Sequence, residues 1–181
     1  MDWFDVADEA TPHLLRNDYA KCEEIVRKAL FEEPPSPFDH VLKSEFTNDP
    51  RDVAIEINAF VERESKQFAV GAIYTETNGF DINPDRWYFD LFAYQTDGGI
   101  EDTDWISNWQ SDLWPECTLT GMEDLQQIYA SNELGSEAAY LFSLLVVIQF
   151  QKLIYSARTY MNIGDIPVYS TGHDYSFIAR C

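Results

Sequence analysis

The stretch from residue 68 to residue 94 contains two β-type segments, Phe68-Ala-Val-Gly-Ala-Ile-Tyr-Thr-Glu76 and Trp87-Tyr-Phe-Asp-Leu-Phe-Ala-Tyr94. Both segments are rich in β-branched and aromatic residues, and the turn signals Asn78-Gly79 and Asn83-Pro84 lie between them. This pattern is typical of two antiparallel strands joined by a loop, here of about ten residues. The stretch therefore predicts a β-hairpin at about 68–95.

Helical patterns flank this hairpin on both sides. Upstream, apolar residues recur every three or four positions over 14–30 and again over 50–66, where Asp49 and Pro50 resemble an N-cap and a first-turn residue. Alternation at Val53, Ile55 and Ile57 leaves a strand possible in the second segment. Downstream, helices are expected at 123–130 and at 136–160.

The expected helix at 136–160 is the longest, and its first half is apolar nearly all round, which is typical of a helix in the centre of a core. Two further strands are expected at 166–170 and 175–179. We therefore predict an α+β fold: an antiparallel sheet, made of the hairpin and the C-terminal strands, covered by helices on one face. The length of 181 residues favours a single domain over 1–181.

Composition limits the class of protein. The net charge of −20 repels nucleic-acid phosphate and anionic membranes, so we expect neither as a partner and instead expect a basic protein partner or simple solubility. The apolar run 138–148 is too short to span a membrane. Three widely separated cysteines, Cys22, Cys117 and Cys181, and an N-terminus without signal-peptide features favour a cytoplasmic protein with reduced thiols.

The acidic residues are unevenly distributed. Residues 87–151 contain no Lys or Arg but carry eleven carboxylates, and they overlap a Trp-rich segment at 100–115. One interpretation is a solvated acidic surface that maintains solubility. The other is an acidic, aromatic surface complementary to a basic partner, because aromatic residues are enriched at interface hot spots and charge speeds the encounter.

The alternation of residues in the second strand of the hairpin bears on which of these two interpretations is correct. Tyr88, Asp90, Phe92 and Tyr94 share one face, and the opposite face is fully apolar. If the apolar face is buried, three aromatic side chains around Asp90 are exposed, as in a binding patch. If both faces are covered, Asp90 is expected to be hydrogen-bonded.

The sequence contains no complete motif for catalysis or metal binding. Asp81, Asn83 and Asp85 have the spacing of a calcium loop, but Arg86 and Phe92 replace the required Gly and Glu. The pair His173-Asp174 has no later Asp to complete a phosphohydrolase metal site, and we expect it in a turn. No nucleophile motif or phosphate cradle is present. We therefore predict no catalytic residues, no metal and no cofactor.

The segments 68–76 and 87–94, followed by a long helix and the closing run Val168-Tyr-Ser-Thr-Gly-His-Asp174, resemble small acidic immunity proteins of bacterial polymorphic-toxin systems. The resemblance is one of class and covers the hairpin and the C-terminal third. It implies a protein that binds a cognate toxin and blocks its active site or substrate entry. The N-terminus without signal-peptide features then implies protection in the cytosol. The acidity would suit a basic toxin such as a nuclease.

The leading hypothesis is a non-enzymatic immunity or inhibitor protein that binds a basic partner through the acidic hairpin and the Trp-rich segment. The predicted contacts are Tyr88, Asp90, Phe92, Asp102, Asp104, Trp105 and Trp109. One alternative is a metal-dependent hydrolase that uses carboxylates of the acidic block. The other is a structural or assembly subunit that self-associates through the aromatic face.

Overall fold

The computed structural model of the protein describes residues 3–32, 39–80, 82–131 and 134–181. The predicted calcium-loop residue Asp81 lies outside them. The helices are α1 (Trp3–Leu14), α2 (Tyr19–Glu32), α3 (Pro50–Glu64), α4 (Glu123–Ser131) and α5 (Ser136–Arg158), with two short 3₁₀ helices, η1 (Asp39–Lys43) and η2 (Asp104–Ser107). The strands are β1 (Ala72–Thr77), β2 (Tyr88–Tyr94), β3 (Cys117–Thr118), β4 (Val168–Gly172) and β5 (Ala179–Arg180).

The α+β prediction is confirmed, and the five strands form one mixed sheet in the order β3-β2-β1-β4-β5. Three neighbouring pairs are antiparallel, including the predicted β1–β2 hairpin and the C-terminal β4–β5 pair. The central β1–β4 pair is parallel, which the prediction of an antiparallel sheet did not include. A parallel pair needs a crossover connection, and the chain supplies one that contains α5.

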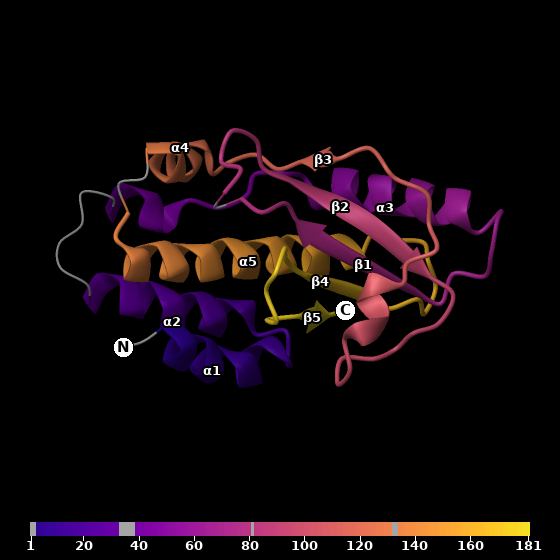
Figure 1. The fold of residues 1–181 in the computed structure, drawn as a ribbon, viewed down its shortest axis with the longest axis horizontal. Coiled ribbons are helices and arrows are strands. Elements are labelled where there is room, and N and C mark those ends of the chain that lie inside the picture. Colours follow the sequence, from indigo (N-terminus) through magenta and orange to yellow (C-terminus); the bar gives the residue numbers. More distant parts are fainter. Residues whose placement is uncertain (1–2, 33–38, 81, 132–133) are drawn as a thin grey trace.

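The helices form a layer on one face of the sheet. Figure 1 shows α5 crossing the middle of the fold, with α1 and α2 on one side of it and α4 on the other. The helix α5 packs against α2, α3 and β4, and α3 also contacts β2. Burial from Leu141 to Gln151 is continuous, because α5 has neighbours on several sides. This explains why a helix long and apolar enough to span a membrane is mostly buried within the protein.

Local sequence signals set the helix boundaries. Asp49 caps α3, because its carboxylate accepts a hydrogen bond from the Arg51 backbone N–H at 2.8 Å and Pro50 occupies the first turn, as predicted. The pattern predicted over 14–30 divides instead between two helices. Leu14 ends α1, and Asn17, with a φ of 57°, reverses the chain before α2.

Candidate functional site

The sheet has an inner face toward α3 and α5 and an outer face on the opposite side. Phe89, Leu91 and Ala93 of β2 point inward and belong to the main core. The outer face is arranged in rows across the strands. Asp90 lies opposite Glu76, and Phe92 lies opposite Tyr74, which is followed by Tyr169 of β4. The apolar face of β2 is therefore the buried one.

The Trp-rich segment covers one end of the outer face. The Trp105 ring packs edge-on against Tyr94, with the ring centres 4.5 Å apart, and against Tyr169 at 5.3 Å. Its indole N–H donates to the Gly99 carbonyl at 2.9 Å, and the Tyr94 hydroxyl donates to the Ile106 carbonyl at 2.7 Å. Trp105 thus closes a second, smaller core on this face.

Asp97 connects the chain just before the Trp-rich segment, which covers the outer face, to β4 and the edge strand β5. Its carboxylate accepts a hydrogen bond from the Tyr169 hydroxyl at 2.6 Å and lies 3.4 Å from the Arg180 guanidinium. Burial acts to raise the pKa of Asp97, but the hydrogen bonds from Tyr169 and the Gly99 backbone, together with Arg180, outweigh it and lower the pKa. A Cβ added at Gly98 would overlap the Trp105 ring, so glycine is needed for this close approach.

The part of the outer face that this cover leaves open is a groove of about 470 Å³, which we call the outer-face groove. Its lining is aromatic and acidic: Phe92, Asp104, Trp109, Glu76, His173 and Asp174 are among the residues that form it. The Trp109 ring is 48% exposed and packs on Phe92 with ring centres 5.2 Å apart. Two strands, η2 and the turn after β4 therefore converge on one groove.

Two carboxylates face each other across the strands beside this groove. Glu76 accepts a hydrogen bond from the Tyr74 hydroxyl at 2.7 Å, and its other oxygen lies 3.0 Å from Nδ1 of His173. Asp90, directly opposite, is half-buried, and its carboxylate makes no hydrogen bond or ion pair within the described part of the chain. Like charges placed directly opposite each other on a sheet are destabilising.

Burial raises the pKa of Asp90 to about 6, and the charges of Glu116 and Glu76 act in the same direction. His173 and Arg86 lie near enough to offset this in part. With a pKa of about 6, the Asp90 carboxylate is charged at neutral pH. No cation forms an ion pair with it among the described residues, so this charge lowers the free energy of unfolding. A cation bound from another molecule would therefore stabilise the charged form of Asp90.

We expect Asp90→Asn to raise the free energy of unfolding by about 1–2 kcal/mol at about pH 8, because it removes a half-buried, unpaired charge. The folded-state pKa of about 6 lies above the ordinary value of 3.8, so the cost of this charge is present above pH 6 and disappears as the pH falls toward 4. The gain should therefore vanish at about pH 4. Urea unfolding at the two pH values measures this, with Asp85→Asn, an exposed aspartate of the same hairpin, as the control. A gain of the same size at both pH values would contradict the assignment.

The predicted contact residues are distributed unevenly around the groove. Phe92, Asp104 and Trp109 line it, and Asp90 lies beside it as the partner of Glu76. The others lie elsewhere: the Tyr88 ring lies under the Arg86 guanidinium at 4.9 Å, the Asp102 carboxylate is exposed and accepts from the Asp104 backbone N–H, and Trp105 is committed to the cover.

Sequence reasoning missed three polar groups of the groove, Glu76, His173 and Asp174. Strand alternation in β1 could have placed Glu76 on the same face as Tyr74. The other two come to the groove only through the parallel pairing of β4 with β1. They lie in a turn, as predicted, with 3.6 Å between the His173 ring and the Asp174 carboxylate.

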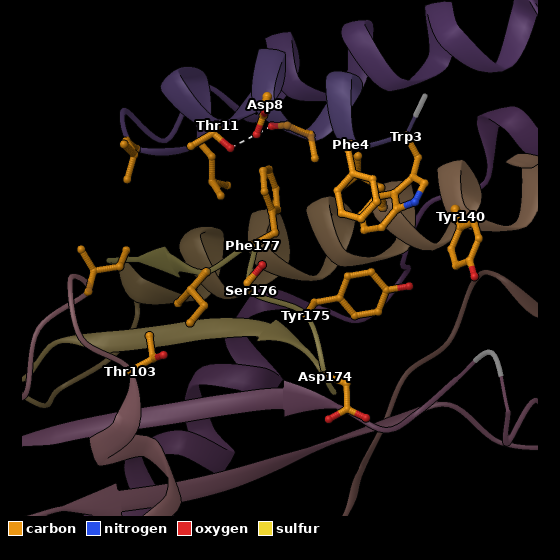
Figure 2. Close-up of a pocket in the computed structure, with 16 residues that line it drawn as sticks. Trp3, Phe4, Asp8, Thr11, Thr103, Tyr140, Asp174, Tyr175, Ser176 and Phe177 are labelled. Carbon is orange, nitrogen blue, oxygen red and sulfur yellow. Dashed lines mark hydrogen bonds between the residues drawn. The ribbon is translucent and has the colours of Figure 1, made fainter. Parts of the chain in front are cut away.

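A second pocket, of about 480 Å³, opens between α1 and residues 174–178, and we call it the α1 pocket. Figure 2 shows Trp3, Phe4 and Tyr140 grouped at one end of it, with Tyr175 and Phe177 extending from the facing segment. Trp3 stacks on Phe4 and Tyr140, with ring centres 3.9 and 5.4 Å apart. These rings give the pocket an aromatic wall.

The segment 174–178 separates the two cavities and lines both of them through Asp174, Tyr175, Ser176 and Ile178. We call it the ridge. The buried Gln151 amide of α5 donates to the Phe177 carbonyl at 2.6 Å and to the Ser170 carbonyl at 3.0 Å, and the Thr171 hydroxyl also donates to the Phe177 carbonyl. The ridge is therefore held in place by the core helix and by β4.

Within the described ranges, no group of three or more His, Cys, Asp or Glu side chains is placed to hold a metal ion. Comparison with protein-family models, with curated proteins and with solved structures finds no match to this chain.

Proposed function

We propose that this chain is a non-enzymatic immunity or inhibitor protein that binds a basic cytoplasmic toxin, such as a nuclease, through the outer-face groove. The observation that carries the proposal is the carboxylate pair of Glu76 and Asp90, where Asp90 has no cationic partner among the described residues. A Lys or Arg side chain of a partner would pair with Asp90 and remove the cost of its unpaired charge.

The surroundings of the pair fit a protein partner. Trp109 and Phe92 offer aromatic surface at the groove, and aromatic residues are enriched at binding hot spots. An arginine in the groove could also stack on these rings. The net charge of −20 would attract a basic protein over long range and discourage acidic competitors. Stability lost at a binding surface is a recurrent compromise between folding and function.

The test is capture followed by inhibition. The immobilised protein should retain a basic protein from its native host at low salt and release it as the ionic strength rises. The purified partner should then lose its own activity, for example nuclease activity, when one equivalent of this protein is added. A captured protein whose activity is unchanged at saturation would overturn the proposal.

Charge reversal on the Trp-rich segment should slow association. Asp102→Lys combined with Asp104→Lys places two positive charges at exposed positions on the Trp-rich segment, and we expect the association rate with the basic partner to fall several-fold at low salt. The control is Glu24→Lys combined with Glu62→Lys, which changes the net charge equally at exposed positions on α2 and α3. Stopped-flow mixing measures both rates, and an equal decrease in the two variants would refute a directed encounter.

A further inference from the structure

The α1 pocket has features of a binding site that neither the core nor the outer-face groove explains. Phe4 and Leu15 are more than 60% exposed at its lining, with relative exposures of 61% and 62%. Ala7 and Thr11 contribute smaller side chains between them, so the helix presents a concave apolar surface. Exposed apolar surface rimmed by polar residues is characteristic of interaction sites.

The charge around this pocket has one sign. Asp8 of α1 and Asp174 of the ridge are exposed carboxylates that line it, and no Lys or Arg is among its described lining residues. The aromatic wall combines Trp3 and Phe4 of α1 with Tyr140 of α5. Flat rings of this kind favour an aromatic occupant, since offset or edge-to-face ring contacts add to the gain from burial. The acidic rim favours an occupant that carries positive charge nearby.

The α1 pocket and the outer-face groove lie on the two sides of the ridge. Thr103, Asp174, Tyr175, Ser176 and Ile178 line both. The ridge is a single segment of chain, and neighbouring extended segments are spaced by about 5 Å. Two or three extended residues span about 7–10 Å, so a short peptide segment could cross the ridge and reach both cavities.

We propose that the α1 pocket takes an aromatic side chain of the same basic partner whose nearby arginine or lysine occupies the outer-face groove. This rests on the proposed function, because the groove supplies the cationic half of the recognition. The partner segment lies across the ridge, with its aromatic residue against Trp3 and Phe4 and its cation beside Glu76 and Asp90. The acidic rim of the pocket excludes an acidic segment from the same position.

The probes are two series of capped peptides, acetyl-Phe-(Gly)n-Arg-amide and acetyl-Ala-(Gly)n-Arg-amide, with one to three glycines. Their affinities are measured by ¹⁵N–¹H chemical-shift titration at low salt. For the best spacing, the Phe peptide should bind at least about fivefold more tightly than the Ala peptide, because burial of an aromatic side chain is favourable. Equal affinity of the two series at every spacing would overturn the proposal.

A variant that fills the α1 pocket tests whether the preference for the Phe peptide arises there. Ala7→Leu adds bulk at a partly buried position of the pocket, and it should reduce the Phe-to-Ala affinity ratio to below about twofold. Ala20→Leu makes the same change at an exposed position of α2 outside the pocket and should leave the ratio intact. A ratio that survives Ala7→Leu would place the aromatic residue elsewhere and refute the assignment.

The Ala peptides separate this proposal from the proposed function. If the Ala peptides bind and Glu76→Gln with Asp90→Asn abolishes their binding, the groove is a cation site whatever the Phe series shows. If acetyl-Phe-Gly-Ala-amide binds as tightly as the Arg peptide, the cation contributes nothing and the shared-partner proposal is wrong.

Discussion

Replacement of Arg63 by alanine should lower the free energy of unfolding by about 3–5 kcal/mol at neutral pH. Glu64 has no exposed surface, and its carboxylate is held by the Arg63 Nε and by the Asp112 backbone N–H at 3.3 Å. Without the guanidinium, a buried negative charge would keep a single backbone donor. Removal of one partner of a buried ion pair is strongly destabilising for this reason.

The same guanidinium also connects α3 to the end of the Trp-rich segment. It donates to the Leu113 carbonyl at 2.9 Å and to the Asp112 carbonyl at 2.8 Å, and it lies 4.7 Å from the centre of the Trp114 ring. These contacts would be lost together with the ion pair, so Arg63→Ala should also loosen the segment that covers the outer face. Amide hydrogen exchange over 105–114 should accelerate accordingly.

Urea unfolding of the wild type and Arg63→Ala measures the effect. Arg51→Ala is the control, since Arg51 is an exposed arginine of the same helix whose guanidinium lies over the Tyr160 ring at 5.4 Å. It should cost less than about 1 kcal/mol. Equal and small losses in the two variants would show that Glu64 is compensated by other groups.

Neutralisation of the carboxylate pair should have the largest effect on binding. Glu76→Gln with Asp90→Asn preserves the shape of the groove but removes both charges, and we expect the dissociation constant for the basic partner to rise at least about tenfold. The double variant should at the same time be more stable above pH 6. The pKa of the Asp90 carboxyl is raised to about 6, so its charge above that pH opposes folding and its removal is a gain. Opposite changes in stability and affinity would distinguish a binding site from a folding contact.

The matched control for this variant is Glu24→Gln with Glu62→Gln. Both glutamates are exposed: Glu24 pairs with Lys21 of α2, and Glu62 of α3 pairs with Lys66, just beyond the end of that helix. The net charge changes by the same amount. Calorimetric titration should show less than about a twofold loss of affinity for the control. A tenfold loss in both variants would mean that net charge alone drives binding and that the groove has no special role.

Most of the fold could be predicted because its signals are local. Alternation predicted the β1–β2 hairpin, and the nearly uniform apolar character after Gly135 predicted the long buried helix. The helix α1 was not predicted. Its apolar stripe leads into that of α2 through Leu14, and the break at Asn17 depends on a positive φ that this residue type does not require.

The site was predictable only in part. Alternation placed Asp90 and Phe92 on one face of β2, and they do lie at the groove or beside it. Trp105 closes a small core, whereas Trp109 stays 48% exposed. Composition alone could not distinguish these two roles, because both residues are tryptophans of the same irregular segment. His173 reaches Glu76 through the parallel β1–β4 pairing, which joins residues almost a hundred positions apart and leaves no local pattern.

The most direct test of the cation site is a ¹⁵N–¹H chemical-shift titration with acetyl-arginine-amide at neutral pH and low salt. The outer-face groove predicts that the largest shifts fall on the amides of Glu76, Asp90 and His173, and that Glu76→Gln with Asp90→Asn removes them. Shifts of equal size spread over the acidic surfaces of α1, α2 and α3, or shifts that persist in the double variant, would contradict it.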